Sequence, residues 1–425
     1  MTPVRLGMTP GVRLPGQKPP GLPVEITPEQ LQALSSEGSR ALAYGLREVS
    51  RVVLGPYGDW FRGLTTCGYP VGVGDWVPIY LTTEGEARRA RAAGLRTCGS
   101  PWACPVCSPA VAEDRAEALE RVVARLWGRG WRVAHAVLTV RHTRGEPLVE
   151  VFGALSRAWR RVISHRRVKA LLRGWEWHRG VEITWGANGW HPHAHLLLLA
   201  PPGVDPCVLE EPLWEAWREA VEAVGWAPSS RGAYVYQVPD EEADVVAVAR
   251  YQEKWGLTHE AAGGPLKKEG GGLTPWELLG VAGVEVLEGE EGVPLILREF
   301  CGHALQDAIR RNLTPEVAAL LWVEYAEGTK GRKRSTASRN LQALLRAELE
   351  ALEQERAQAR LLEIVHLKRT LYLHLLRRMR LAQLLHWAEV LGSVAAACEL
   401  MGLVPEEEWR EVYRAQAPPE GEVAA

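Results

Sequence analysis

The alternation of apolar and polar positions predicts that strands and helices follow one another between residues 76 and 255. Apolar residues at helical spacing with charges between them indicate helices, and short runs of β-branched and aromatic residues indicate strands. Helices are expected over 111–127, 157–172, 210–224 and 241–255. Strands are expected over 76–81, 134–140, 181–185, 190–200 and 234–238. Beyond Thr314 the pattern is helical to the end, so the sequence predicts an α+β core followed by helices.

Three histidines alternate along the expected strand 190–200, at His191, His193 and His195. Alternate residues of a strand share one face, so all three imidazoles are expected to point the same way. Two imidazoles at positions i and i+2 can converge on one divalent ion. The alternative interpretation is that these histidines bind backbone groups, or that they hold a structural zinc ion.

Glu182 lies on the neighbouring expected strand, before the turn sequence Gly186–Gly189. If those four residues form the loop, Glu182 pairs with His193, whereas a two-residue turn at Asn188-Gly189 pairs it with His195. Either register brings the carboxylate to the face of the histidines. Two imidazoles and a carboxylate form a mixed nitrogen–oxygen site that suits Mn²⁺ or Mg²⁺ in a phosphate-handling enzyme, although Zn²⁺ is also compatible with it.

Four cysteines form a second candidate metal site. Cys98, Cys104 and Cys107 lie close together in the sequence, and Cys67 lies well upstream of them. The Cys-x2-Cys spacing lets two thiolates bind one tetrahedral ion, and two further cysteines complete a closed structural Zn²⁺ site. The alternative is a group of buried thiols that pack as small apolar side chains.

The expected helix 241–255 carries Tyr251 and Lys254 on one face, because residues three apart are neighbours on a helix. A tyrosine hydroxyl can attack a phosphodiester and hold the product covalently. Its pKa of about 10 requires help at neutral pH, which a metal ion at the scissile phosphate and a lysine beside it supply. The alternative is an ordinary amphipathic helix, and only its place downstream of the histidine hairpin favours catalysis.

The net charge of −2 conceals two basic segments, 151–180 and 328–346. Local patches, not the net charge, determine how a protein contacts a phosphate backbone. The alternative for each segment is a solvated helix face. The candidate DNA-binding residues are Arg157, Arg160, Arg161, Lys330, Arg332, Lys333 and Arg334.

The composition also excludes some classes of protein. No apolar run reaches the roughly eighteen residues of a membrane span, so no membrane partner is expected. Residues 1–25 are rich in proline and glycine and lack the apolar region of a signal peptide. They are expected to form a flexible leader of a cytoplasmic protein, with Met8 as an alternative start to Met1. In that compartment the seven cysteines stay reduced, which favours metal binding over disulfides.

Taken together and in order, these segments resemble those of the plasmid rolling-circle replication initiators (Rep proteins), which are members of the His-hydrophobic-His (HUH) endonuclease superfamily. The resemblance extends over about residues 60–345. The segments that carry it are CGSPWACPVC at 98–107, AVLTV at 136–140, VEITW at 181–185, GWHPHAHLLL at 189–198, ARYQEKW at 249–255, TPWELL at 274–279 and EYAEGTKGRKR at 324–334.

The resemblance implies a five-stranded antiparallel sheet flanked by helices, with the metal hairpin at its centre and the tyrosine helix beside it. A zinc-binding N-terminal part precedes this core, and an all-helical C-terminal extension follows it. The expected organisation is a flexible leader at 1–25, an N-terminal region with the four-cysteine zinc site at 26–110, a nicking domain at 111–262, a linker and basic helical segment at 263–345, and a helical extension at 346–425. Three functions are compatible with the sequence of the extension: binding duplex DNA, self-association as a homodimer, or packing against the core to stabilise it.

The resemblance also implies a role for each site residue. His193 and His195 would be the paired metal ligands, with Glu182 as the third. His191 would be a further ligand or a group behind the ligands. The catalytic residues would be Tyr251, as the nucleophile that forms a 5′-phosphotyrosine link, and Lys254, as its electrostatic assistant.

The implied substrates are single-stranded and origin DNA, and the implied partners are a host helicase, DNA polymerase and single-strand-binding protein. The freed 3′-hydroxyl would prime synthesis of the leading strand. One position departs from the family pattern. Some members place a glutamate one helical turn before the tyrosine, as a base for the water that ends the cycle, but here that residue is Ala247. Asp244 and Glu253 are candidate substitutes.

Two alternatives to a replication initiator are compatible with the sequence. A single-tyrosine transposase or a conjugative relaxase would use the same chemistry, and the order of the segments and the cysteine region favour the initiator over both. A non-catalytic, zinc-stabilised DNA-binding regulator is the other alternative. The complete set of expected metal ligands and catalytic residues argues against it.

Overall fold

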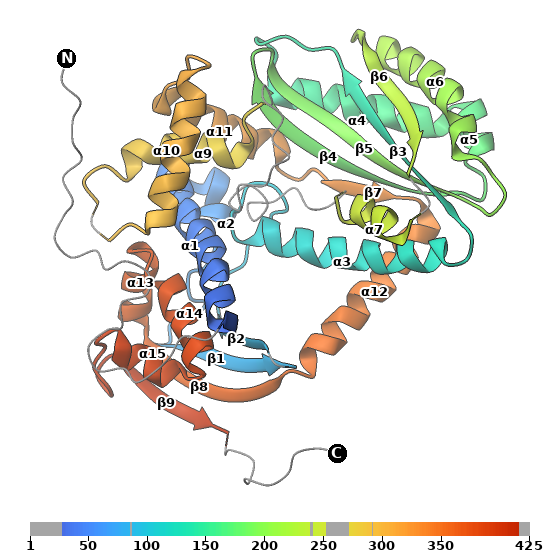
Figure 1. Cartoon of the computed structure of the whole chain (residues 1–425). Coiled ribbons are helices and arrows are strands. Elements are labelled where there is room, and N and C mark those ends of the chain that lie inside the picture. Colours follow the sequence, from blue (N-terminus) through green and yellow to red (C-terminus); the bar gives the residue numbers. More distant parts are fainter. Residues whose placement is uncertain (1–27, 86, 239–240, 252–271, 291, 416–425) are drawn as a thin grey trace.

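The computed structural model of the chain describes residues 28–85, 87–238, 241–251, 272–290 and 292–415. Within these ranges the chain forms two antiparallel sheets surrounded by helices (Figure 1). The predicted α+β class is therefore confirmed. None of the described helices is long and apolar enough to cross a membrane. The predicted leader at 1–25 lies outside the described residues.

One sheet has five strands and carries the histidines. In spatial order its strands are β6 (Pro228–Gln237), β3 (Arg132–Val140), β5 (Gly189–Ala200), β4 (Glu176–Gly186) and β7 (Ser335–Ala337). The strand β5 is therefore central. Four of the strands come from the segment 111–262, but β7 comes from 263–345, which the sequence predicts as a linker and basic helices. This edge strand is only three residues long, too short to produce an alternating pattern.

Helices cover both faces of this sheet. Alternate residues of β5 show the division, because Leu196 and Leu198 belong to one apolar core and Leu197 and Leu199 to another. The first core includes α4 and α6, and the second includes α3, α7 and the start of α12. These helices are α3 (Cys107–Trp127), α4 (Leu148–Ser164), α6 (Glu210–Ala223), α7 (Glu242–Tyr251) and α12 (Arg339–Ala357).

The expected single helix 157–172 is interrupted. The helix α4 ends at Ser164, and α5 (Arg166–Leu171) begins after His165, whose backbone is extended with φ −62° and ψ 132°. A short 3-10 helix, η2 (Pro206–Leu209), precedes α6. The basic residues of the predicted helix are therefore divided between two helices, α4 and α5.

A group of helices packs beside the five-stranded sheet. It consists of α1 (Pro28–Leu54), η1 (Gly55–Phe61), α2 (Arg62–Thr65), α9 (Pro275–Val286), α10 (Leu295–Ile309) and α11 (Pro315–Thr329). The start of α9 is fixed by a capping box, in which Thr274 and Glu277 each bind the other's backbone N–H. Trp322 on α11 is fully buried among these helices and joins them to the main core.

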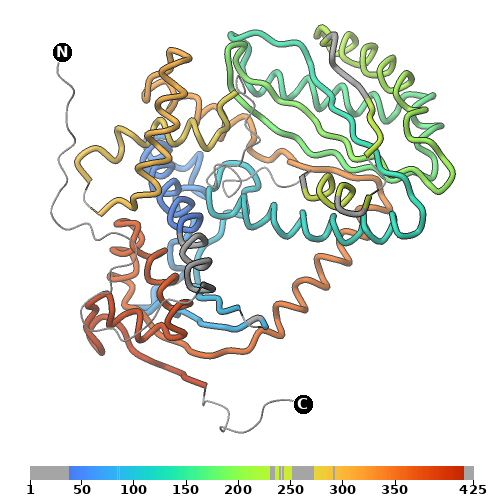
Figure 2. Tube along the Cα trace, viewed as in Figure 1, coloured from blue at the N-terminus to red at the C-terminus, as the bar shows by residue number. Residues whose placement is uncertain are grey.

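The second sheet joins segments from opposite ends of the chain. Its strands, in spatial order, are β2 (Ala87–Ala92), β1 (Trp76–Glu84), β8 (Arg360–Lys368) and β9 (Trp409–Arg414). Figure 2 shows the early and the late part of the chain side by side here. The helices α13 (Arg369–Arg377), α14 (Leu381–Leu391) and α15 (Val394–Leu400) pack on this sheet and share its apolar core.

The prediction of an all-helical extension at 346–425 is wrong, because β8 and β9 lie within it. In β8 the buried side chains alternate at Glu363, Val365 and Leu367, as expected for a strand. The segment 361–367 is short and mostly apolar, and periodicity alone does not separate such a segment from a helix. Its pairing with β1 makes it a strand. The region expected at 26–110 and the extension therefore contribute to one sheet.

Candidate metal and nicking site

The hairpin β4–β5 sets the geometry of the candidate metal site. Gly186 pairs with Gly189, and Ala187 and Asn188 form the turn between them. This register places Glu182 directly opposite His193, which is the pairing of the first predicted alternative, although the turn has two residues and not four. Gly189 has φ +81°, a conformation that glycine adopts without a steric penalty.

The hairpin tip is sensitive to the side chain at position 189. A Cβ at Gly189 would lie 2.8 Å from the Cα of Arg144 in the facing loop, and the positive φ would add backbone strain. We expect Gly189→Val to lower the free energy of unfolding by about 2–4 kcal/mol. Gly203→Val is the matched control, because it shares a positive φ but nothing lies near its Cβ position. Urea denaturation measures both, and equal losses would contradict a specific contact at the tip.

Glu182, His193 and His195 form one compact group. The Nε2 atom of His193 lies 2.5 Å from Oε2 of Glu182, and the Nε2 atom of His195 lies 3.3 Å from the same oxygen. One ligand atom of each residue lies within 4.8 Å of the others. Two imidazole nitrogens and one carboxylate oxygen at these separations fit a divalent ion with mixed ligands.

The three groups strongly perturb one another. Burial alone would raise the pKa of Glu182, but the neighbouring His193 and His195 hold this pKa at about 2. Burial would lower the pKa of His193, but the Glu182 carboxylate raises it above its ordinary value. Burial also lowers the pKa of His195, in spite of its hydrogen bond to Glu182. The carboxylate is therefore ionised and available to a cation at neutral pH.

His135 on β3 lies directly behind His195. Its Nε2 atom is 3.2 Å from Nδ1 of His195, and the two rings are stacked with centroids 5.3 Å apart. Burial lowers the pKa of His135 to about 3, so the ring is neutral. A neutral ring can accept the Nδ1 proton of His195, which leaves Nε2 of His195 as the ligand atom. The sequence did not single out this residue, although it is the one histidine in a mostly apolar expected strand.

His191 is not part of the compact group, although its ring centroid lies 5.0 Å from that of His193. Its Nδ1 atom lies 2.7 Å from Nε2 of His142, a residue that sequence analysis also missed. The Nδ1 atom of His142 is 2.9 Å from the carbonyl oxygen of Asn188, to which it must donate because a carbonyl only accepts. In neutral rings the Nδ1 of His191 therefore donates to His142. The lone pair of His191 then lies on its Nε2 atom.

The helix α7 packs on the face of the sheet that carries these histidines. Its residues Val245 and Ala249 are buried in the same apolar core as Leu197 and Leu199 of β5. Tyr251 belongs to α7 and is its last described residue, so the structure places its backbone on a helix that packs on the histidine face. Lys254, the other predicted catalytic residue, lies outside the described residues.

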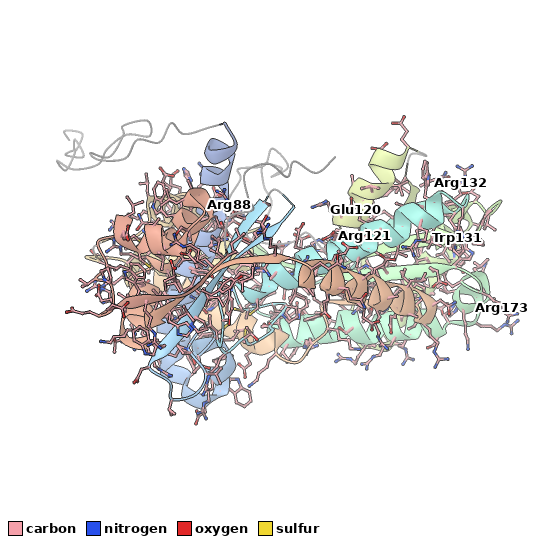
Figure 3. The ribbon with its side chains drawn as sticks, turned by 90° about the horizontal axis from the view of Figure 1, so that it is seen from below. Arg88, Glu120, Arg121, Trp131, Arg132 and Arg173 are labelled. Atoms are coloured by element: carbon pink, nitrogen blue, oxygen red, sulfur yellow. The ribbon has the colours of Figure 1, made fainter. Side chains whose placement is uncertain are left out.

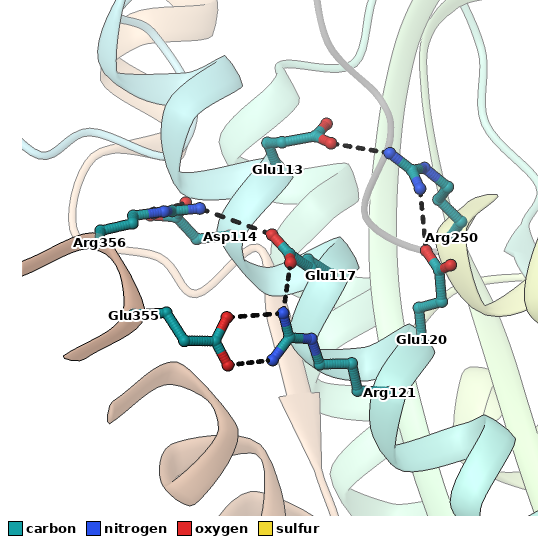
Figure 4. Close-up of polar contacts among 8 residues, drawn as sticks. All are labelled: Glu113, Asp114, Glu117, Glu120, Arg121, Arg250, Glu355 and Arg356. Carbon is teal, nitrogen blue, oxygen red and sulfur yellow. Dashed lines mark hydrogen bonds and ion pairs between the residues drawn. The ribbon is translucent and has the colours of Figure 1, made fainter. Parts of the chain in front are cut away.

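Ion pairs attach the end of α7 to α3. Arg250, which precedes Tyr251, binds Glu113 at 2.9 Å and Glu120 at 3.0 Å (Figure 4). Each exposed pair contributes little by itself, but two acids on one guanidinium restrict the position of the last helical turn. The opposite side of α3 binds α12 through Arg121–Glu355 and Arg356–Asp114. Figure 3 shows α3 and α12 side by side, with Glu120 and Arg121 on α3.

The four predicted zinc ligands also come together. One sulfur atom of each of Cys67, Cys98, Cys104 and Cys107 lies within 4.8 Å of the others. The sulfur of Cys67 is 3.6 Å from that of Cys107 and 3.7 Å from that of Cys104. A tetrahedral ion with Zn–S bonds of about 2.3 Å requires sulfurs about 3.8 Å apart. Both separations from the sulfur of Cys67 are close to this value, so the cluster suits such an ion.

Hydrogen bonds join the four cysteines, so each thiol affects the protonation of the others. Hydrogen bonds, first of all with the thiol of Cys104, hold the pKa of Cys67 well below its ordinary value. The pKa of Cys104 is raised, because its thiol proton is shared with Cys107 and Cys67. Arg51 donates to the backbone oxygen of Cys67 and so anchors the upstream cysteine to α1. The upstream cysteine is thus held beside the Cys-x2-Cys knuckle in spite of its distance in the sequence.

The candidate DNA-binding residues fall into two groups. Arg157, Arg160 and Arg161 lie on α4, on the face of the sheet opposite the histidines, where they line a cavity of about 670 Å³ between α4 and α6. In the second group, Arg334 is buried and donates to the backbone oxygen of Pro101 and to the hydroxyl of Ser108, so it holds these segments of the fold together. The other members are Lys330, which donates to the oxygen of Trp60, Arg332, which donates to Val149, and Lys333, which is exposed.

Comparisons with known proteins agree with part of the predicted identity. The sequence model of a family described as a replication protein matches residues 89–220. A curated protein from Streptomyces cyanogenus, named neomycin resistance protein, is 33% identical over 150 residues, which cover 28% of this chain and 34% of that protein. The chain thus aligns with about a third of the length of that relative. No solved structure matches the chain. The family match supports a replication initiator, and the matched segment contains Glu182, His193 and His195.

Proposed function

We propose that this chain is a plasmid rolling-circle replication initiator of the HUH superfamily, which nicks and rejoins one DNA strand at the origin. One observation carries the proposal. Glu182, His193 and His195 converge on one face of the sheet, and the helix packed on that face carries Tyr251. A regulator that only binds DNA has no need for a partly buried group of one carboxylate and two imidazoles on the face that packs against a tyrosine-bearing helix.

Glu182, His193 and His195 would hold Mn²⁺ or Mg²⁺, and His135 would orient the ring of His195. When bound, the ion draws negative charge from the scissile phosphate and so favours attack on it. His191 stands beside the ligands with its Nε2 atom free to accept a hydrogen bond, in line with the expectation of a group behind the ligand pair.

The nucleophile would be the phenolic oxygen of Tyr251. It forms a bond to the phosphorus atom while the bond from phosphorus to the 3′ oxygen breaks. The phenolic proton is passed through solvent to the departing 3′ oxygen, so the products are a 5′-phosphotyrosine and a free 3′-hydroxyl. Lys254 would stabilise the negative charge that develops on the phosphate. The free hydroxyl would then be extended by a host polymerase, with a helicase and a single-strand-binding protein acting on the displaced strand.

The four cysteines would hold a structural Zn²⁺ ion. All four positions are protein ligands, so no position is left open for a substrate or a reactive water. The site would fix the start of α3 at Cys107. Because α3 also binds α7 and α12, this ion would support the nicking face indirectly.

A cleavage assay tests the proposal. We expect the purified chain with Mn²⁺ to cut one single-stranded oligonucleotide from a set that tiles its plasmid origin. Protein should become attached to the 5′ side of the downstream fragment, and Tyr251→Phe should reduce this adduct below detection. Tyr413→Phe is the control, because Tyr413 is exposed on β9 of the other sheet. No adduct from the wild type, or an equal adduct from Tyr251→Phe, would refute the mechanism.

A further inference from the structure

Arg179 on β4 is a buried guanidinium whose surroundings do not neutralise it. Only 6% of the residue is exposed. In the described part of the chain its Nε atom has no hydrogen-bond partner, and no carboxylate forms an ion pair with it. Burying a charge without a counter-charge is unfavourable unless a ligand supplies one.

The group facing Arg179 across the sheet edge is also unsatisfied. Thr336 on β7 pairs directly with Arg179, so the two side chains share one face of the sheet. The hydroxyl of Thr336 is buried and, among the described residues, makes no hydrogen bond. A guanidinium and a hydroxyl side by side offer donors to the oxygens of a single anion.

Further arginines extend the positive charge along α4. Burial, and after it the nearby charge of Arg160, lower the pKa of Arg179 to about 10. Arg157 is three residues before Arg160 and therefore lies on the same side of the helix. Arg157 and Arg332 flank Gly153, where a Cβ would lie 3.0 Å from one guanidinium and 4.0 Å from the other. These like charges repel one another, and bound anions would offset that repulsion.

The acids near this series are few. Glu219 on α6 faces the cavity that Arg157 and Arg160 line, and it lies 3.7 Å from His165. No described ion pair joins Glu219 to the arginines. The series therefore keeps its positive charge, and it lies on the face opposite the histidines.

We propose that Arg179, Thr336 and Arg160 bind a phosphate group of the DNA backbone, and that Arg157 and Arg332 contact neighbouring phosphates. The inference rests on the proposed function for its choice of ligand. Planar guanidiniums match phosphate oxygens in pairs, and neighbouring phosphates are spaced at intervals that a row of side chains can follow. The site would hold DNA that flanks the nick, because the metal ligands lie on the other face of the sheet.

The test compares stability with DNA affinity in the full chain. Arg179→Met removes the buried charge but keeps the length of the side chain. We expect an unchanged or higher melting temperature, together with about 10- to 100-fold weaker binding of origin DNA at low salt. The slope of log Kd against log salt should fall by about one. A residue that only supports the fold would instead lower the melting temperature on removal.

Two further variants keep the result decisive. Arg160→Met changes an exposed residue and should weaken DNA binding without affecting the fold. Arg173→Met removes an exposed arginine at the far end of the domain (Figure 3), and it should bind DNA as the wild type does. Wild-type affinity and salt slope in both Arg179→Met and Arg160→Met would overturn the proposal. So would an unfolded Arg179→Met variant beside an Arg160→Met variant with wild-type affinity.

The choice of ligand has its own controls. Single-stranded and duplex origin fragments are titrated separately, and orthophosphate alone is tested for its effect on the melting temperature. Stabilisation by orthophosphate, with DNA affinity unchanged in both variants, would make free phosphate the ligand and overturn the assignment to DNA. Binding does not require cleavage, so a chain that binds through Arg179 but forms no tyrosine adduct would refute the proposed nicking alone.

Discussion

Replacing Glu182 with glutamine should abolish Mn²⁺-dependent nicking while the hairpin stays folded. Glutamine has the same shape, but it lacks the charge that pairs with His193 at 2.5 Å and reaches His195 at 3.3 Å. We expect Mn²⁺ affinity to fall at least about 100-fold and the cleavage rate by roughly 10³-fold, since the ion contributes several kcal/mol to the transition state. Electron paramagnetic resonance of free Mn²⁺ measures the affinity, and gel analysis of the cut oligonucleotide measures the rate.

Glu219→Gln is the matched control for this change. Glu219 lies on α6, on the opposite face of the sheet, and it does not belong to the group of ligands. The control should keep wild-type Mn²⁺ affinity. If Glu182→Gln also binds Mn²⁺ as the wild type does, the carboxylate is not a ligand and the assigned site is wrong.

The pH dependence of Mn²⁺ binding provides a second readout of the same variant. A metal ion competes with the proton on His193, so affinity should fall about tenfold for each pH unit below the pKa of this residue. The Glu182 carboxylate raises that pKa above the ordinary value of 6.5, and the decline in the wild type should therefore begin above pH 6.5 as the pH is lowered. In Glu182→Gln the carboxylate no longer offsets the burial of His193, so the decline should begin at a lower pH. The same onset in both proteins would contradict the ion pair.

Removing one cysteine of the four should have the largest effect on folding. We expect the wild type to contain one Zn²⁺ per chain and Cys104→Ser to contain almost none. Structural zinc binding amounts to about 10–16 kcal/mol in small zinc domains, so its loss should unfold the region around Cys67 and the start of α3. Elemental analysis and thermal unfolding, each with and without a chelator, measure the two effects.

Cys301→Ser separates metal binding from the simple loss of a buried thiol. Cys301 is also buried, but it lies alone on α10 and outside the group of four. This variant should retain its zinc and lose only modest stability. Equal zinc content in Cys104→Ser and the wild type would show that the thiols merely pack together.

The residues that sequence analysis placed most accurately are those governed by local rules. Period-two alternation puts Glu182 on the histidine face in any register that keeps the apolar residues buried. The spacing of Cys104 and Cys107 likewise brings two sulfurs together without knowledge of the rest of the chain. In both cases the partners are separated by a turn or a knuckle, so a few residues contain all the information.

The residues that were missed depend on contacts between distant segments. His135 and His142 lie in or beside β3, and only the pairing of β3 with β5 brings them to His195 and His191. Arg179 reads as one more basic residue of a charged stretch until the sheet and α4 bury it. For the same reason β8 was predicted as a helix, because its partner β1 lies in a remote part of the sequence.

That pairing has a consequence for synthesis of the chain. The strand β1 ends at Glu84, but the strand that covers its free edge begins only at Arg360. At about 5–20 residues per second, a ribosome needs roughly a quarter of a minute to a minute to make the intervening segment. During this interval the β1–β2 hairpin exposes unpaired backbone groups to other nascent chains. Fragments that contain residues 76–92 but stop before β8 should therefore aggregate, and removing residues 76–92 from such a fragment should improve its solubility.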